Sequence, residues 1–293
     1  MNAEISQNKA KKPLKYYTAV TRAFREEMER DENVVLIGED VGPSGGIFAQ
    51  TKGLFKQFGP DRVRDTPIAE AGFTSLAVGA AMTGLRPIVE IGFEDFVTAC
   101  MDPIVNQAAK LRYMLGGQVS VPVTLYTFGS GGVNAGPQHS QSLAAWFSHV
   151  PGIKVVQPSC ASDALGLLKS SIRDNNFVLC MLCKSLVGSK DFVSGDADDF
   201  LIPLGKADVK REGVNATVVS MPCWEIFDLQ SKEYKKLILG SSPRIAIEAA
   251  AKLGWEKWLQ NNDIFIGMNS FGASAPASDL YNHFKIDIQN IVD

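Results

Sequence analysis

The sequence predicts an α/β protein with a parallel sheet, followed by a smaller α/β unit. Short apolar runs alternate with helix-like segments along most of the chain, which is the order of βαβ units. The apolar runs are continuous, as is typical of strands that are buried on both faces. At roughly 150 residues per domain, the length of 293 residues suggests about two domains.

The first helix is expected in YTAVTRAFREEMERD, because Val20, Phe24 and Met28 recur every four residues. The expected strands of the first unit are NVVLIGED, RPIVEIGF, VPVTLYTF, IKVVQPS and FVLCMLC. The helices between them are expected at about residues 71–84, 95–115, 141–148 and 161–174.

The chain divides into four parts by its composition. Residues 1–14 form a polar tail, residues 15–187 the first unit, residues 188–215 a linker rich in acids and glycines, and residues 216–293 the second unit. The second unit has three expected strands, ATVVSMP, PRIAIEA and DIFIGM, and helices near 224–238, 255–260 and 276–284. So small a core is expected to pack against another part of the protein.

Composition excludes several classes of protein. The 29 Lys plus Arg nearly balance the 32 Asp plus Glu, for a formal charge of -3. Nucleic acid and anionic membranes are therefore not expected as partners. The sequence contains no apolar run of about 18 residues, and its first residues lack the apolar core of a secretory signal. A cytoplasmic location is expected.

The five cysteines are an odd number, which argues against a disulfide framework and fits a reducing compartment. Cys180 and Cys183 form a C-x-x-C inside an apolar strand, where alternation places them on opposite faces. No second pair follows at zinc spacing, so we interpret them as structural thiols.

Two glycine-rich strings match functional motifs only in part. Gly42–Gly46 matches G-x-S-x-G, but Pro43 precedes Ser44 and no clean helix follows, so a hydrolase is disfavoured. The string GSGGVN puts Asn134 where a dinucleotide fingerprint has its third glycine. A nicotinamide site is therefore disfavoured as well.

Other residues are candidates by their position alone. His139 follows the strand VPVTLYTF, and ligands of parallel sheets bind at the carboxyl ends of strands. Glu70 begins a helix that is rich in small residues. The helix dipole favours a carboxylate at this end, which alone is enough to explain its position. Phe93 ends the strand RPIVEIGF and Phe96 follows it, and core packing explains both equally well.

Several motifs in one order then carry a resemblance over about residues 15–211. They are GEDVG, GGIF, FG-x-x-RV-x-DTPI-x-E-x-GF, GAAMTGLRPIVEI-x-F-x-DF, GPQHSQSLAAWF-x-H-x-PGIKVV-x-PS and SSIRDNN. Together they resemble the beta subunit of thiamine-diphosphate-dependent 2-oxo acid dehydrogenases of the pyruvate, branched-chain and acetoin type. The resemblance implies that the parallel sheet belongs to a pyrimidine-binding domain.

The resemblance also implies roles for individual residues. Glu70 matches the acid that contacts the aminopyrimidine and promotes its imino tautomer, which deprotonates the thiazolium carbon. Phe93 matches the aromatic residue that stacks on the pyrimidine, with Phe96 close by, and His139 matches a histidine that handles protons on the substrate. Further matches are Glu39 and Asp40, near a proton path between two active sites, and Asp174 and Asn176, at a structural potassium (K⁺) site of some relatives.

A missing motif is also informative under this resemblance. The superfamily holds the cofactor's diphosphate through Mg²⁺ and a GDG...N stretch, which Gly195-Asp196-Ala197 imitates poorly. The resemblance therefore implies a separate alpha-type subunit that supplies the metal and the diphosphate site, in an α2β2 assembly.

From about residue 214 the chain instead resembles the C-terminal domain of transketolase, in VVSMPCWEIFDLQS, RIAIEAAAKLGWEKWL and IGMNSFGASAPASDLY. The strand and helix that open this domain in both families are absent between Glu212 and Ala216. The unit is thus shortened, which leaves docking to a lipoyl acyltransferase core open.

The function expected from these matches is the pyrimidine-side subunit of a two-chain thiamine diphosphate enzyme that decarboxylates a 2-oxo acid such as pyruvate. The first alternative is the small subunit of a split transketolase that transfers a two-carbon ketol unit. The second alternative, from another class, is a noncatalytic scaffold subunit.

Overall fold

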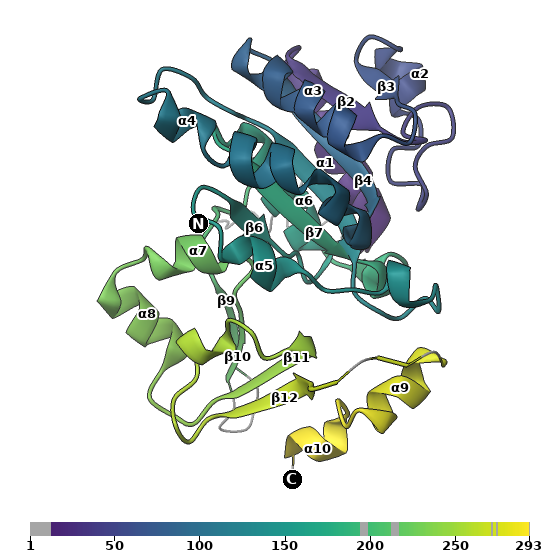
Figure 1. The fold of residues 1–293 in the computed structure, drawn as a ribbon. Coiled ribbons are helices and arrows are strands. Elements are labelled where there is room, and N and C mark those ends of the chain that lie inside the picture. The colour runs from purple at the N-terminus through teal and green to yellow at the C-terminus, as the bar shows by residue number, and fades with distance from the viewer. Residues whose placement is uncertain (1–12, 194–198, 212–216, 271, 274, 293) are drawn as a thin grey trace, which may run out of the picture.

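The computed structural model describes residues 13–193, 199–211, 217–270, 272–273 and 275–292. The predicted polar tail therefore lies almost wholly outside the described residues. A six-stranded parallel sheet forms the centre of the molecule, in the order β3-β2-β4-β5-β7-β6 (Figure 1). Its strands are β2 (Val34–Gly38), β3 (Val63–Asp65), β4 (Arg86–Phe93), β5 (Thr124–Gly129), β6 (Lys154–Val156) and β7 (Val178–Cys183). The predicted parallel sheet is confirmed.

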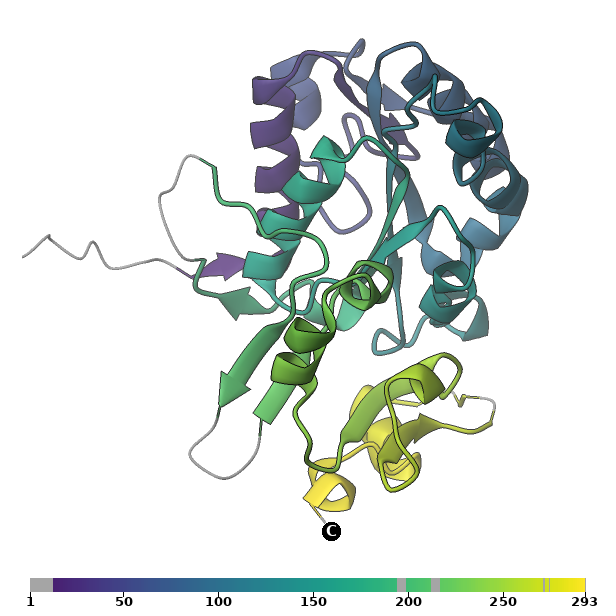
Figure 2. The ribbon, with the colours of Figure 1, turned by 90° about the vertical axis from the view of Figure 1, so that its left-hand side faces the viewer.

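Successive residues of each strand point into two separate cores. Leu36 and Ile88 pack with α1 (Tyr16–Arg30) and α6 (Ala161–Arg173) on one face. Val35 and Val89 pack on the other face, against α3 and its neighbours. Burial of both faces explains why the sequence shows continuous apolar runs. Figure 2 shows the sheet between these two layers.

Helices α3 (Glu70–Met82) and α5 (Ala144–Ser148) lie close to their predicted positions. The predicted helix over residues 95–115 is wrong as a single helix. It is divided into a 3₁₀ segment, η1 (Glu94–Cys100), a π segment, η2 (Asp102–Ala108), and a short α-helix, α4 (Leu111–Met114). Pro103 lacks an amide donor for a regular helix, and Glu94 and Asp95 bond to another loop instead.

Several elements lie outside those expected from the sequence, among them one helix and one short sheet. The helix is α2 (Leu54–Phe58), in the loop after β2. The sheet pairs β1 (Leu14–Lys15) with β8 (Lys190–Asp191) in antiparallel fashion. β8 falls within the range predicted as linker, residues 188–215, so this range contributes a strand beside the N-terminal end of α1. The proposed domain boundaries stay a prediction.

The C-terminal part contains two separate two-stranded sheets. β10 (Thr217–Ser220) pairs antiparallel with β9 (Asp208–Arg211), whereas β11 (Ile245–Ala251) pairs parallel with β12 (Ile264–Met268). The three expected strands thus exist, but they do not share a sheet. The helical segments are α7 (Trp224–Asp228), α8 (Lys232–Leu239), η5 (Trp255–Lys257), α9 (Ala277–His283) and α10 (Ile288–Val292).

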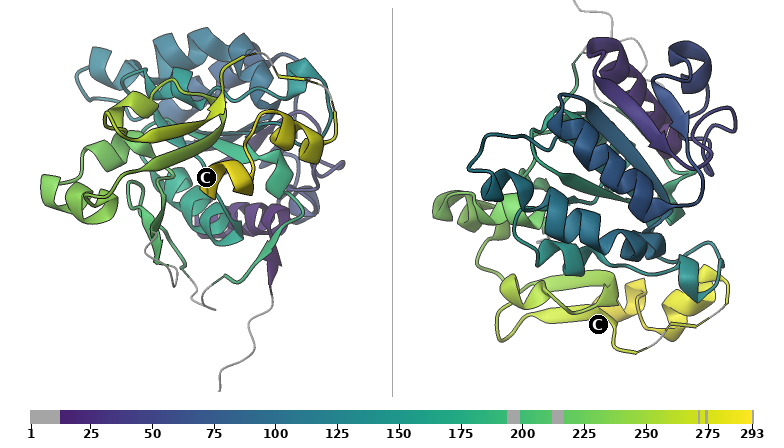
Figure 3. Two further views of the ribbon diagram at one scale, coloured as in Figure 1. Left: turned by 90° about the horizontal axis from the view of Figure 1, so that it is seen from below. Right: turned by 45° about the horizontal axis from the view of Figure 1, so that its top comes forward.

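The C-terminal part packs against the end of the central sheet near β6 (Figure 3). The Gln157 amide donates to the carbonyl of Pro222 at 2.8 Å, and the Val155 amide donates to Glu225 Oε2 at 3.3 Å. The smaller unit therefore does rest on the larger one, as expected. Among the described residues, no helix has both the length and the apolar character needed to cross a bilayer.

Candidate functional site at the carboxyl edge of the sheet

The candidate residues follow the carboxyl ends of neighbouring parallel strands. In the register of the sheet, Gly38 of β2 lies opposite Asp65 of β3 and Glu90 of β4, and Gly129 of β5 lies opposite Cys183 of β7. The residues that come next in each chain segment therefore gather at one edge. This is the edge at which parallel α/β sheets bind ligands.

Glu70 is the first residue of α3 and is half-buried. Its carboxylate lies near Glu39, since burial first, then the negative charges of Glu70 and Asp40, raise the pKa of the Glu39 carboxyl. The Glu39 Oε1 atom is buried and has no hydrogen-bond partner among the described residues. This corner of the site thus holds closely spaced acids with an unused acceptor.

Phe93, Phe96 and His139 form an aromatic cluster. The ring of His139 lies 4.6 Å from that of Phe93 and 5.3 Å from that of Phe96, both edge to face. All three side chains are half-buried. Within the described residues, no hydrogen bond or ring contact joins Glu70 to this cluster. The tertiary structure therefore forms two groups, the acids around Glu70 and the rings around His139.

Acids of η1 hold the loop that carries His139. The Gln141 side chain and amide donate to Asp95 Oδ1, at 2.9 and 3.3 Å, and the Leu143 amide donates to Glu94 Oε1. The Ser130 amide donates to the Gln141 carbonyl at 2.9 Å and closes the base of the loop. The loop is thus fixed at its base and behind His139.

Lys184 fixes the loop at His139 itself. Its ammonium donates to the His139 carbonyl and lies 5.5 Å from the centre of the Phe93 ring. The side chain is only 2% exposed. Burial lowers the pKa of Lys184, while the charges of Asp95 and Glu94 oppose that shift. Sequence reasoning missed this residue, although a lysine that directly follows an apolar strand was a usable signal.

Glu90 of β4 is deeply buried, as is Glu94 of η1. Glu90 accepts hydrogen bonds from the Tyr126 hydroxyl and, at 2.7 Å, from Gln50 Nε2. Burial raises the pKa of Glu90 to about 7 and that of Glu94 to about 7. The signal in the sequence was an acid in the middle of a continuous apolar strand, RPIVEIGF.

Asp174 and Asn176 lie away from these groups, near the starts of β4, β6 and β7. Lys154 pairs with Asp174, whose Oδ1 also accepts from the Asn176 amide at 2.8 Å. Arg86 donates to the Asp174 carbonyl at 2.7 Å. Across the residues that the structure describes, no group of three or more His, Cys, Asp or Glu could hold a metal ion. The potassium site stays a prediction.

All five cysteines are free. Cys180 is buried and donates to Ser171 Oγ at 3.4 Å, and Cys183 lies 3.1 Å from Ser130 Oγ. Cys180 is thus buried as expected, whereas Cys183 is only half-buried, and their interpretation as structural thiols stays a prediction.

The parallel sheet, with its candidate residues at the carboxyl edge, is typical of ligand-binding α/β domains. Comparison with known proteins identifies the family. The model of the transketolase pyrimidine-binding domain matches residues 12–190, and that of the transketolase-like C-terminal domain matches residues 204–287. The chain therefore belongs to the transketolase family, through its pyrimidine-binding domain.

Relatives within this family are dehydrogenase beta subunits. The chain is 44% identical to the 2-oxoisovalerate dehydrogenase subunit beta of Bacillus subtilis over 75% of this chain and 67% of that one. It is 42% identical to the acetoin:2,6-dichlorophenolindophenol oxidoreductase subunit beta of the same organism over 80% and 66%. It is 45% identical to the human pyruvate dehydrogenase E1 component subunit beta, over 73% of this chain and 62% of that one. The chain thus spans about two thirds of the length of these relatives.

Solved structures agree on the fold. An inactive beta4 tetramer of a split-gene transketolase superposes with a TM-score of 0.72 at 17% identity, over 94% of both chains. Transketolase from Leishmania mexicana superposes with a TM-score of 0.70 at 21% identity, over 93% of this chain and 44% of that one. At such identities the likeness concerns the fold.

Proposed function

We propose that this chain is the pyrimidine-side subunit of a two-chain thiamine diphosphate enzyme that decarboxylates a 2-oxo acid such as pyruvate. The observation that carries the proposal is the half-buried Glu70 at the start of α3, with Glu39 beside it. The identity of 42–45% to beta subunits of 2-oxo acid dehydrogenases supports the choice of donor.

The residues at the carboxyl edge fit the pyrimidine half of the cofactor. When bound, thiamine diphosphate supplies an acidic thiazolium carbon that adds to a carbonyl and accepts the electron pair of the broken bond. Glu70 would hold a proton against a ring nitrogen. Phe93 and Phe96 offer aromatic surface, and His139 would move protons at the substrate.

A second chain would complete the site. We propose an alpha-type partner with a GDG...N stretch that holds Mg²⁺ and the diphosphate, in an α2β2 assembly. Helix α3 offers this chain a free surface for assembly, since Leu76 and the preceding Ile68 are 60% and 83% exposed. Such exposure of large apolar side chains beside a helix of small residues is typical of an interface. We place the assembly in the cytoplasm, where five free thiols are stable.

The alternative donor is a ketose phosphate, as in a split transketolase. The match of residues 204–287 to the transketolase-like C-terminal domain favours it. The first unit favours the 2-oxo acid, and it carries the candidate site.

Replacement of Glu70 by Gln tests the proposal. The variant should fold and assemble with an alpha-type chain, while exchange of the thiazolium proton into deuterated water slows by orders of magnitude, because an amide cannot shuttle the proton. Nuclear magnetic resonance (NMR) of quenched samples measures this exchange directly.

Asp61→Asn is the matched control, because Asp61 is 98% exposed. The control complex should exchange at the wild-type rate. An unchanged rate in the Glu70→Gln complex would contradict the proposed role of Glu70. Micromolar, Mg²⁺-dependent cofactor binding by the isolated chain would contradict the two-chain arrangement.

A further inference from the structure

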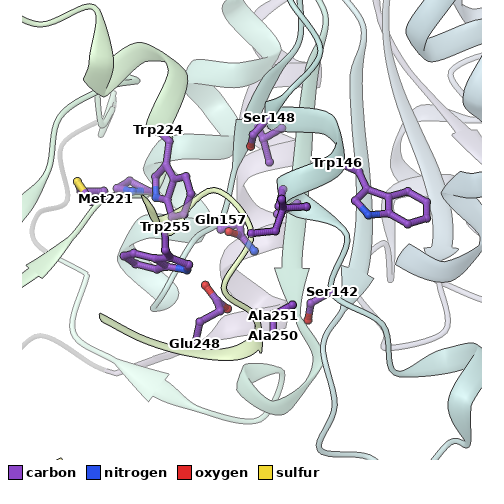
Figure 4. A pocket seen from close by; sticks show the side chains of 15 residues that line it. Ser142, Trp146, Ser148, Gln157, Met221, Trp224, Glu248, Ala250, Ala251 and Trp255 are labelled. Carbon is purple, nitrogen blue, oxygen red and sulfur yellow. The ribbon is translucent and has the colours of Figure 1, made fainter. Parts of the chain in front are cut away.

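A cavity of about 90 Å³ lies between the C-terminal part and the central domain. Residues of both contribute to its wall: Gln157 follows β6, whereas Trp224, Glu248 and Trp255 belong to the C-terminal part (Figure 4). Nothing in the proposed thiamine diphosphate chemistry uses this cavity. It needs a separate explanation.

Aromatic and aliphatic surfaces line the cavity. The rings of Trp224 and Trp255 are 4.7 Å apart at an angle of 77° and form one side (Figure 4). Val155, Ala250 and Ala251 contribute aliphatic surface. These surfaces can receive the apolar body of a small ligand.

Glu248 is the charged group of the cavity. Its carboxylate points into the space between Trp255 and Gln157 (Figure 4). Within the described chain, Glu248 makes no hydrogen bond or ion pair, and burial alone raises the pKa of its carboxyl.

A lysine of the same part of the chain is already paired. Lys257 of η5 binds Asp228 Oδ2 at 2.8 Å and lies over the ring of Trp258. A partly desolvated carboxylate without a cation is costly, and a ligand with a positive charge would remove that cost. The faces of indole rings attract cations as well.

We propose that this cavity binds a small organic ammonium ion, with its charged group between Glu248 and the two indole rings and its apolar body against Val155 and Ala251. The size of the ligand follows from the volume. A cavity of about 90 Å³ admits only a small molecule. The proposal is independent of the thiamine diphosphate reaction.

Benzylammonium and benzyl alcohol form a matched pair of probes, because they share size and ring but differ in charge. The full chain is titrated with each at constant ionic strength, and binding is followed by calorimetry and by protein–probe cross-relaxation in NMR. Benzylammonium should bind at least about tenfold more tightly than benzyl alcohol, as a charge-assisted contact requires. Equal binding of the two probes, or no saturable binding of benzylammonium, would overturn the proposal.

Variants assign the binding to this cavity. Glu248→Gln should weaken benzylammonium about tenfold and leave benzyl alcohol unchanged, because only the charge is lost. Trp255→Leu should weaken benzylammonium more than benzyl alcohol. Glu233→Gln, on the exposed surface of α8, is the control and should bind like wild type. Circular dichroism confirms that each variant is folded, and wild-type affinity in folded Glu248→Gln would place the ligand elsewhere.

Discussion

Lys184 is almost entirely removed from water, and its ammonium contacts the loop of His139. Its ammonium is bound to the His139 carbonyl and lies near Glu94 and Asp95. The aliphatic stem packs in the interior, as long charged side chains commonly do. Lys184, the residue directly after β7, therefore helps to fix the position of His139 in another loop.

Lys184→Met is expected to free the His139 loop while the fold remains. Loss of the charged hydrogen bond should lower the free energy of unfolding by about 1–3 kcal/mol. The ring resonances of His139 should shift and broaden, and diethyl pyrocarbonate should modify His139 severalfold faster. Lys190→Met, at the exposed end of β8, is the control. Unchanged His139 resonances in Lys184→Met would contradict the positioning role.

The buried acid Glu90 makes stability depend on pH in an unusual direction. Its pKa is raised by burial to about 7 in the folded protein, above the ordinary value of 4.5. The folded state thus binds more protons than the unfolded state between these values. The stabilisation from protonated Glu90 is complete below about pH 4.5 and is lost as the pH rises through about 7.

Glu90→Gln should therefore flatten the fall of the unfolding free energy between pH 5 and about pH 8. At the upper end the variant should be more stable than wild type by on the order of 2–3 kcal/mol. Urea unfolding followed by circular dichroism at several pH values measures this. Some slope remains, because Glu94 titrates in the same direction. If the unfolding free energies of wild type and variant changed with pH in parallel, the assigned pKa would be wrong. Glu29→Gln, on the exposed surface, is the control and should follow wild type.

At the scale of elements, α1 and α6 are joined by buried ion pairs as well as by apolar packing. Glu27 of α1 has a fully buried side chain and contacts Arg173 of α6 at 2.7 Å. Arg173 also binds Asp199, beyond the end of the central domain. This guanidinium thus joins two helices that are distant in sequence, and the buried Lys169 of α6 joins them as well through Glu26 of α1.

Arg173→Met is expected to destabilise the protein by about 2–4 kcal/mol, because Glu27 remains buried with only Arg30 as a partner. Arg64→Met is the matched control, since the Arg64–Asp61 pair is exposed and is worth less than about 1 kcal/mol. Chemical unfolding compares the two. The double variant Glu27→Gln/Arg173→Met should recover part of the loss, and equal losses in both single variants would contradict the buried-pair argument.

At the scale of the whole molecule, the two units carry different indications of the substrate. A sugar phosphate needs accessible cations. Lys154 is paired with Asp174 near the strand starts, and Lys184, beside His139, is buried and bound to a carbonyl. This chain therefore offers little to bind a phosphate group beside His139.

The reconstituted two-chain complex is expected to release carbon dioxide from pyruvate or a close homologue and to show little ketol transfer from xylulose 5-phosphate. Carbon dioxide capture and a coupled ketol-transfer assay measure the two reactions on one preparation. The Glu70→Gln complex should be inactive in both. Ketol transfer without decarboxylation would show that the transketolase-like C-terminal unit is the better guide to the donor.

Local patterns were enough to predict much of the central domain. β4 has the same bounds as the predicted strand RPIVEIGF, and α3 and α6 lie within two residues of their predicted ranges. These elements follow from apolar periodicity and from residues near in sequence. The motifs likewise placed Phe93 at the end of a strand and Glu70 and His139 after strand ends, since the carboxyl edge of a parallel sheet is set by strand direction alone.

Only the tertiary structure decided which groups meet. No pattern in residues 95–115 shows that Glu94 and Asp95 bond to the loop of His139, or that Lys184, 45 residues from His139 in sequence, binds its carbonyl. Nor does the local sequence predict that β10 pairs with β9 and does not join the sheet of β11. Strand pairing and buried charge depend on neighbours far away in the chain, whereas periodicity reports only whether a segment has an apolar face.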